Sequence, residues 1–348
     1  MKNKVSMQDI ADSLGVSKVT VSKVLRGKSD VSESVEKKVK DEAFRLGYCY
    51  DGKSRKHASK IMVLTAEHFF GGSDCFYVKL YRYLSAELET QHIDAILTIL
   101  DRQSENENVI PEKLKNCEVD GVIVMGQIRR EYLAQLRELR IPMVFLDFYY
   151  DDFDVTSINT DNFFSAYEMT NRLIRCGHTK IGFVGTLDYT SSIQDRFLGY
   201  CKALIEHHIP FHREWVFDDR ESDGRYLEIS LPNIMPTAFV CNCDEVAMLL
   251  IDNLKQKGYR VPLDISVAGF DDSIHAVKSE PQITTVHVNL NEMAHFAVKA
   301  VLRDAVGNSR QKNRILSRGK IISRESVLDL RNGRTADAVQ EEEKNRSR

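Results

Sequence analysis

The sequence predicts an α/β protein in which a small all-α head precedes a two-lobed body of doubly wound parallel sheets. Residues 1–48 carry helical patterns and almost no strand signals, whereas residues 61–330 alternate short β-rich runs with longer helical stretches. Strands that alternate with helices are typical of parallel sheets covered by helices on both faces. The body is long for a single sheet of this kind, so we expect two similar lobes.

Short β-rich runs and longer amphipathic stretches define the expected elements of the body. The strands are expected at residues 61–66, 95–100, 121–125, 143–147, 181–185, 237–241 and 265–269. The helices are expected at residues 77–91, 162–175, 195–207, 244–257 and 290–306. We assign about 61–160 and 290–320 to the first lobe and about 161–289 and 321–330 to the second. Residues 331–348 are polar, and we expect a disordered tail there.

The charge of the chain is unevenly distributed. The formal net charge is −3, but residues 1–60 hold 14 basic and 8 acidic residues and the remainder is strongly acidic. A basic head suggests that this part meets a polyanion. No apolar run approaches the 18 residues of a membrane span, so we expect no membrane contact. The start of the chain has no signal-peptide pattern, and seven scattered cysteines suggest free thiols, so we expect a cytoplasmic protein.

The head carries the pattern of a helix-turn-helix. Ser6 is expected to cap a first helix, with Asp9 three residues on completing a capping box. Gly15 ends that helix, Ser17 caps a second, and Ser32 caps a third. A small residue, a turn glycine and an apolar residue then stand at the spacing that lets two helices cross closely.

The second helix is predicted to enter the major groove of double-stranded DNA. A lysine can donate to guanine and a valine can touch a thymine methyl group, while hydroxyls near the capped end can hold phosphates. The alternative is a small three-helix bundle with a solvated basic face. The residues expected at the DNA are Ser6, Ser17, Lys18, Val19, Thr20, Ser22, Lys23, Lys28 and Ser32.

Polar residues follow several predicted strands of the body, where parallel sheets bind ligands in a cleft. Arg196 is expected near the start of a helix that begins around Gln194, and buried carboxylates beside an arginine suit a polyhydroxyl ligand. Phe76 and Tyr77 precede a helix at a strand exit and are candidates for stacking on a sugar. Packing is the alternative for every aromatic residue. The strand-end candidates are Asp147, Asn242, Asp244 and Asp271.

Several motifs resemble the LacI/GalR (lactose-repressor) family of bacterial transcriptional regulators. They are residues 5–11 (VSMQDIA), 15–27 (GVSKVTVSKVLRG), 46–48 (LGY), 141–147 (IPMVFLD), 177–185 (GHTKIGFVG) and 267–272 (VAGFDD). The resemblance covers residues 4 to about 328 and implies a body like a type I periplasmic binding protein. It also implies that Asp147, Ser192, Arg196 and Asp271 bind an effector. Where relatives carry Asn-Asp, this chain has Cys243-Asp244, which leaves the identity of the effector open.

The segment between the head and the body, residues 49–60, departs from the family pattern. It contains neither proline nor leucine and is shorter than the usual hinge, although Lys53, Arg55, Lys56 and Lys60 can contact phosphates. Family members use hinge leucines to wedge open the minor groove. We therefore expect this chain to bend its operator less than relatives do.

The sequence is thus interpreted as a DNA-binding transcriptional regulator, most simply a repressor of carbohydrate-utilisation genes. We expect a homodimer on a near-palindromic operator and a small sugar-like effector, with a nucleobase or a sugar phosphate left open. No motif for phosphate-loop, metal or nucleophile chemistry is present, so we expect no enzyme activity and no cofactor. Two alternatives remain: a sugar-binding sensor without operator specificity, and a regulator that needs a co-repressor or a partner protein.

Overall fold

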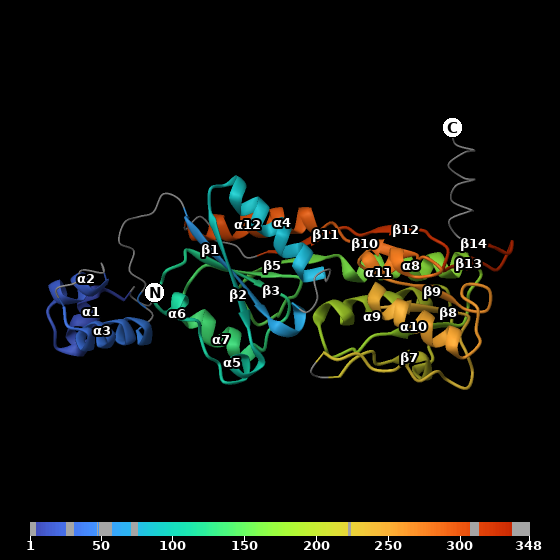
Figure 1. Ribbon diagram of the computed structural model, residues 1–348, viewed down its shortest axis with the longest axis horizontal. Coiled ribbons are helices and arrows are strands. Elements are labelled where there is room, and N and C mark those ends of the chain that lie inside the picture. Colours follow the sequence, from blue (N-terminus) through green and yellow to red (C-terminus); the bar gives the residue numbers. More distant parts are fainter. Residues whose placement is uncertain are drawn as a thin grey trace.

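The computed structural model describes residues 5–25, 31–46, 48, 58–70, 76–221, 224–306 and 313–335 of the 348-residue chain. A helical head, a first lobe and a second lobe follow one another along the longest axis (Figure 1). The predicted fold class is confirmed. Residues 49–57 of the expected hinge lie outside the described ranges. Its last residues already belong to the body, because the backbone N–H of Ser59 donates to Asp120 Oδ2 at 2.7 Å.

The head folds as three short helices, α1 (Met7–Leu14), α2 (Lys18–Leu25) and α3 (Glu33–Arg45). Ser6 and Asp9 form the predicted capping box at the start of α1. Gly15 ends the helix with a left-handed φ of 63°, a conformation that glycine adopts without strain from a Cβ atom. Ile10, Ala11, Val21, Val24 and Val39 form the buried centre, so the first two helices cross closely over the third.

The first lobe is built on a six-stranded parallel sheet in the order β11-β5-β4-β3-β1-β2. Successive residues of a strand point to opposite faces, so Ile61 and Val63 face one side of the sheet and Met62 and Leu64 the other. The strands are β1 (Lys60–Ala66), β2 (Asp94–Leu100), β3 (Gly121–Met125), β4 (Met143–Leu146), β5 (Thr156–Thr160) and β11 (Arg314–Ser317).

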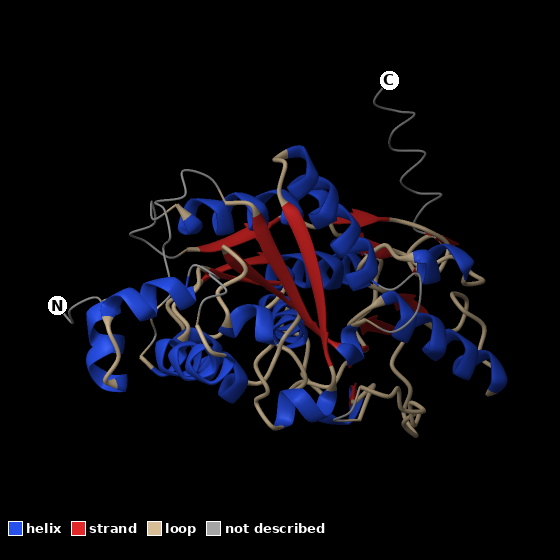
Figure 2. Cartoon of the chain, turned by 60° about the vertical axis from the view of Figure 1, so that its left-hand side comes forward, coloured by secondary structure: helices blue, strands red, loops and turns tan. Residues whose placement is uncertain are grey.

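Helices cover both faces of this sheet (Figure 2). On one face, α4 (Phe76–Thr90) packs against α12 (Leu290–Ala305), which joins it from far along the chain. The other face is covered by α5 (Arg102–Asn106), α6 (Glu112–Lys115) and α7 (Arg130–Glu138).

The second lobe repeats the arrangement with a four-stranded parallel sheet in the order β7-β6-β8-β9. Its strands are β6 (Ile181–Val184), β7 (Val216–Phe217), β8 (Ala238–Cys241) and β9 (Ser266–Ala268). One face carries α8 (Asn162–Arg175) and α9 (Ser191–Glu206), and the other carries α10 (Asp244–Gln256) and α11 (Ile274–Lys278). Short 3-10 helices, η1 (Glu67–Phe69) and η2 (Arg213–Trp215), follow β1 and precede β7.

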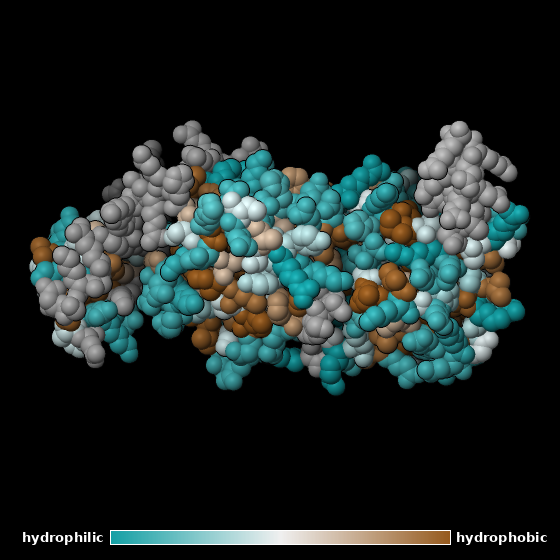
Figure 3. Space-filling model, turned by 45° about the horizontal axis from the view of Figure 1, so that its top comes forward, coloured by the Kyte–Doolittle hydropathy of each residue, from teal (hydrophilic) through white to brown (hydrophobic). Residues whose placement is uncertain are grey.

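Two short antiparallel pairs complete the body: β10 (Thr285–His287) with β12 (Lys320–Ile322), and β13 (Leu328–Asp329) with β14 (Arg334–Thr335). The chain passes between the lobes three times, after β5, before α12 and after β11. Hydrophilic side chains cover much of the face seen in Figure 3, with smaller hydrophobic patches between them. In the described part of the chain, no helix has the length and apolar character needed to cross a membrane.

Two expectations about elements are wrong. The disordered tail does not begin at Arg331, because the backbone N–H and guanidinium of Arg331 bind the carboxylate of Asp329 and close the β13–β14 turn. Residues from 336 onward lie outside the described ranges. The helix predicted from Asp195 begins four residues earlier, at Ser191, because Thr190 Oγ1 accepts the N–H of Ile193 and caps it.

Leu84 tests the packing of the first lobe. Its side chain is fully buried in the core between α4 and the sheet, so Leu84→Ala removes apolar contacts and leaves a cavity. We expect a loss of about 2–5 kcal/mol in the free energy of unfolding, measured by urea denaturation. Arg82→Ala, an exposed change on the same helix, is the control and should stay within about 0.5 kcal/mol of the unaltered chain. Equal losses in both variants would contradict this packing.

Candidate functional site

The head exposes one face of α2. Lys18 and Val19 are exposed, with 64% of Val19 open to solvent, whereas Ser22 and Lys23 are half-buried. A valine exposed to this extent does not pack in the core of the head. The other side of the same helix supplies Val21 and Val24 to the core, so the predicted reading face points outward.

The hydroxyls expected to hold phosphates also organise the helix ends. Ser17 Oγ accepts the N–H of Thr20 at 3.0 Å and lies 2.8 Å from Thr20 Oγ1, so the two hydroxyls share the capped end of α2. Ser6 caps α1 in the same way. Ser32 is exposed directly before α3, and Lys28 lies outside the described residues.

A cavity of about 340 Å³ lies between the two lobes, where several strands of each sheet end. Its size is at the lower end for small-molecule sites, roughly 300–1,000 Å³. Its lining mixes aromatic rings with charged and amide groups. The lining residues that matter below are Phe76, Tyr77, Asp147, Tyr189, Ser192, Arg196, Arg220, Tyr226, Asn242, Cys243 and Asp271.

Asp147 follows β4 and presents a buried carboxylate to the cavity. Tyr77 Oη donates to its Oδ2 at 2.8 Å, while Oδ1 is buried without a hydrogen-bond partner in the described part of the protein. Burial raises the pKa of Asp147 to about 6, although the Arg196 guanidinium acts in the opposite direction. A buried acceptor without a donor is costly, so Oδ1 favours a ligand that supplies a hydroxyl or an amine.

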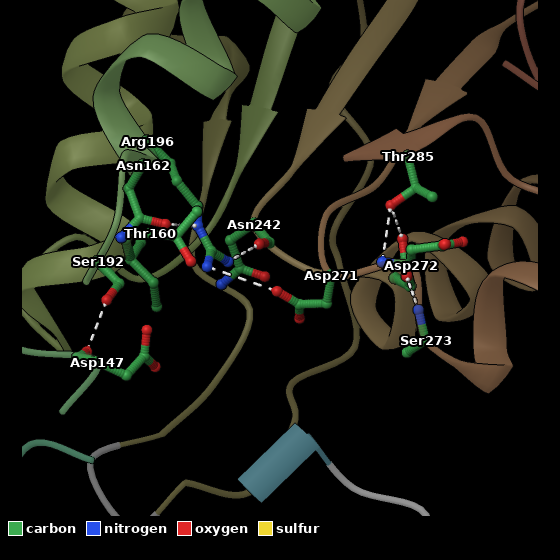
Figure 4. A network of polar contacts seen from close by, with 12 residues as sticks. Asp147, Thr160, Asn162, Ser192, Arg196, Asn242, Asp271, Asp272, Ser273 and Thr285 are labelled. Atoms are coloured by element: carbon green, nitrogen blue, oxygen red, sulfur yellow. Dashed lines mark hydrogen bonds and ion pairs between the residues drawn. The ribbon is translucent and has the colours of Figure 1, made fainter. Parts of the chain in front are cut away.

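Arg196 lies at the centre of the site and is held from three sides (Figure 4). Its Nε donates to Asn162 Oδ1 at 2.8 Å, Nη1 donates to the carbonyl of Asn242, and Nη2 lies 3.5 Å from Asp271 Oδ1. The guanidinium also stacks on the ring of Phe270, 3.7 Å from its centroid. These contacts orient the planar donor fork before any ligand arrives.

Asp271 follows β9 and completes the polar set. Burial raises its pKa to about 8, against the attraction of Arg196. Both Asp147 and Asp271 have left-handed backbones, with φ of 68° and 103°. Such φ values are unfavourable for residues with a Cβ atom and concentrate at functional sites. The surrounding fold must therefore hold the backbone of both residues in this unfavourable conformation, and this fixes the position of the two carboxyl groups.

The remaining predicted residues occupy less direct positions. Ser192 lines the cavity, but its Oγ donates to the backbone carbonyl of Asp147 at 3.0 Å and so joins the two lobes. Phe76 and Tyr77 line the cavity as the first residues of α4 rather than before a helix. Arg196 lies in the second turn of α9, not at its start, four residues from Ser192 on the same face.

Asn242 and Asp244 differ in where they point. Asn242 lines the cavity and its Nδ2 donates to Asp219 Oδ2 at 3.0 Å. Asp244 is not among the lining residues, because its carboxylate accepts from Thr285 Oγ1 at 2.5 Å and from the N–H of Ser273 at 2.7 Å. It therefore holds the loop that carries Asp271 rather than facing a ligand. Cys243 does line the cavity, and burial raises the pKa of its thiol to about 12.

Sequence reasoning missed one side of the cavity, formed by the loop after β7. Arg220 binds Asp219 Oδ2 through Nε at 2.8 Å and Nη2 at 2.6 Å. Its guanidinium also lies 5.0 Å from the ring centroids of both Tyr189 and Tyr226. The strand β7 has only two residues, too few to give a periodic signal, so the residues after it could not be placed at a strand end.

The chain matches two family models: "Bacterial regulatory proteins, lacI family" over residues 6–49 and "Periplasmic binding protein-like domain" over residues 170–327. It is 30% identical to the HTH-type transcriptional regulator RegA of Clostridium saccharobutylicum over 336 residues, which cover 93% of this chain and 99% of RegA. The chain belongs to the LacI family. It is also 29% identical to NtdR, the NTD biosynthesis operon regulator of Bacillus subtilis (strain 168), over 92% of this chain and 99% of NtdR.

Solved structures of LacI-family members share the fold. The transcriptional regulator CelR in complex with cellobiose superposes with a TM-score of 0.67 at 21% identity, covering 92% of this chain and 99% of CelR. The Lac repressor dimer bound to operator and the anti-inducer ONPF gives 0.65 at 22% identity, covering 94% and 100%. This LacI-family chain is a DNA-binding transcriptional regulator, as its curated relatives are.

The buried carboxyl of Asp147 predicts a pH-dependent stability. Its pKa rises from 3.8 to about 6 on burial, so the folded chain holds this proton more tightly than the unfolded chain. Its contribution to the free energy of unfolding therefore falls as pH rises from about 4 to about 6 and stays low above that. Asp147→Asn should be more stable than the unaltered chain by about 1–3 kcal/mol at pH 8, with little difference at pH 4.

Urea denaturation at the two pH values measures this effect. Asp94→Asn, a change of the same kind at an exposed position, is the control and should leave the stability unchanged at both. A stability gain that is equal at pH 4 and pH 8 would show that the buried charge is not its cause.

Proposed function

We propose that this LacI-family regulator is a cytoplasmic repressor of carbohydrate-utilisation genes whose operator affinity is set by a sugar-like effector in the cleft between its lobes. The observation that carries the proposal is the cavity itself. A space of about 340 Å³ beside aromatic rings is faced by the buried carboxyl of Asp147, the half-buried carboxyl of Asp271 and the preoriented guanidinium of Arg196. Each of these polar groups can bind hydroxyls with fixed geometry, and the rings can stack on a sugar face.

The electrostatics favour a neutral effector over a sugar phosphate. Each guanidinium that lines the cavity already has a carboxylate partner, Asp271 for Arg196 and Asp219 for Arg220. Asp147 and Glu245 add further carboxyl groups to the lining. A phosphate dianion would meet this acidic lining without an uncommitted arginine, whereas hydroxyls can donate to the carboxylate oxygens and accept from the arginines.

The head supports operator binding as a homodimer. One recognition helix spans only a half-site, and a two-fold dimer therefore reads a near-palindromic sequence. The named CelR complex holds cellobiose and the named Lac repressor is a dimer on its operator, and we extend both properties to this chain as part of the proposal. We assign the chain no catalytic activity and no cofactor.

Lys18 tests the head. The operator is first selected from random double-stranded DNA, and affinities for it and for scrambled DNA are measured by fluorescence anisotropy at one salt concentration. Lys18→Ala should reduce the ratio of specific to non-specific affinity about 5- to 150-fold, which corresponds to about 1–3 kcal/mol for a lost base contact. Lys37→Ala removes the same charge from an exposed position on α3 and should leave the ratio within about twofold. If the two variants behave alike, α2 is not the reading helix.

Asp271 tests the effector cavity. Titration of the operator complex with a panel of sugars identifies the compound that changes operator affinity. Asp271→Asn should weaken the binding of that compound about 10- to 100-fold, because the amide replaces one carboxyl oxygen with an NH2 group and so removes a hydrogen-bond acceptor, while operator affinity without effector stays within about twofold. The control is Asp272→Asn, whose side chain binds Arg324 and His287 outside the cavity. Equal effects of both changes, or unaltered effector binding in Asp271→Asn, would contradict the assignment.

A further inference from the structure

A second cavity, the outer groove, lies beside the inner cavity that is assigned above to the effector. Its volume is about 400 Å³, and its lining includes Arg102, Glu105, Asn106, Gln127, Arg129 and Tyr150. These residues follow β2, β3 and β4 of the first lobe, at the carboxyl ends of the strands, which is where parallel sheets bind ligands. The strand ends of β2 and β3 supply no residue to the inner cavity.

The two compartments share a wall made of His68, Phe69 and Tyr189, which line both. The rings of His68 and Phe69 are 4.1 Å apart, and each lies about 6 Å from Tyr189, at 6.1 Å and 6.3 Å between centroids. Because His68 and Phe69 come from the first lobe and Tyr189 from the second, the wall exists only while the lobes are together. A ligand that fills the inner cavity therefore touches the boundary of the outer groove.

Glu105 gives the outer groove a built polar contact. Only 6% of the residue is exposed, and its Oε1 accepts the backbone N–H of Arg129 at 2.8 Å. Its other carboxylate oxygen has no hydrogen-bond donor within the described ranges. A buried carboxylate with one oxygen fixed and one available can accept a ligand hydroxyl at a defined position.

The charges of the outer groove favour a neutral ligand. The Arg129 guanidinium is already engaged, since Nη1 donates to Asn106 Oδ1 at 2.9 Å and Nη2 lies 3.4 Å from Glu131. Glu105 and Asp188 offset the positive charges of Arg102 and Arg129. Aromatic faces, amides and a carboxylate without an excess of either charge are the groups that recognise a sugar ring through stacking and hydroxyl hydrogen bonds.

We propose that the outer groove is a second subsite of the cleft, and that the effector is a disaccharide with one ring in the inner cavity and the other in the outer groove. This inference rests on the proposed sugar effector. The inner cavity holds the first ring through Asp147, Arg196 and Asp271, and Glu105 and Asn106 hold the hydroxyls of the second ring. The linkage passes beside Tyr189, the residue of the shared wall that the second lobe contributes.

Calorimetry on the full chain tests the proposal with glucose, galactose, mannose and fructose and with cellobiose, maltose, lactose and sucrose as probes. We expect one disaccharide to bind at least about tenfold tighter than either of its units. Glu105→Gln and Asn106→Ala should each weaken that disaccharide about tenfold and change the binding of its monosaccharide less than about twofold. Asn106 is exposed, so its variant tests the groove even where the buried change at Glu105 impairs folding.

Gln103→Ala is the matched control, because Gln103 lies on the same short helix, is exposed and, within the described part of the chain, makes its one side-chain hydrogen bond to Glu107. It should leave both affinities unchanged. If a monosaccharide binds as tightly as every disaccharide that contains it, the second subsite is overturned. The same holds if the groove variants weaken the disaccharide and the monosaccharide equally. Either result leaves the proposed sugar effector standing. Failure of every sugar to bind overturns the proposed effector class and the subsite together.

Discussion

The arrangement of the cleft depends on the guanidinium of Arg196, which is paired with Asp271 and acts electrostatically on the buried carboxyl of Asp147. A buried charge is expensive unless it is paired and hydrogen-bonded. Arg196 meets this requirement through Asn162, Asn242 and Asp271, and it stacks on Phe270. Asp147 does not, since one of its oxygens has no partner among the residues described. The site therefore keeps an unmet demand for a donor, which a ligand hydroxyl satisfies.

The fold accepts this cost because hydrogen bonds hold the segments around the site in place. Asp147 and Asp271 leave β4 and β9 with left-handed backbones, and each is followed by a segment that is itself anchored. Asp244 shows how the anchoring works: its carboxylate binds the N–H of Ser273 and the hydroxyl of Thr285 on either side of the Asp271 loop. A residue that sequence reasoning placed at the ligand thus acts by positioning a neighbour.

Much of the fold could be predicted from periodicity. The polar strand β5 and the side of the cavity formed by Arg220 could not. Strands such as Gly121–Met125 are continuous apolar runs, which give an unambiguous signal. The strand Thr156–Thr160 is entirely buried but reads TSINT, so hydrophobicity does not reveal it. Asp147, Arg196 and Asp271 were found because they follow strong strands or matched family motifs, while Arg220 follows a two-residue strand. Glu105 carried no signal at all, since its burial depends on a distant backbone N–H.

Helix α9 connects ligand binding to the orientation of the lobes. Its first turns contribute Arg196 to the cavity, and they also contact the first lobe: Ser192 donates to the carbonyl of Asp147, and the N–H of Ser191 donates to Gln127 at 2.8 Å. Asp195 on the same helix binds Arg314 at 2.7 Å and accepts from Tyr149 at 2.9 Å, both across the lobe boundary. A ligand can shift the lobes only by the difference in its affinity for their two arrangements. Because the same helix carries both sets of contacts, a ligand that binds Arg196 and the first lobe together also favours the pairing of α9 with the first lobe.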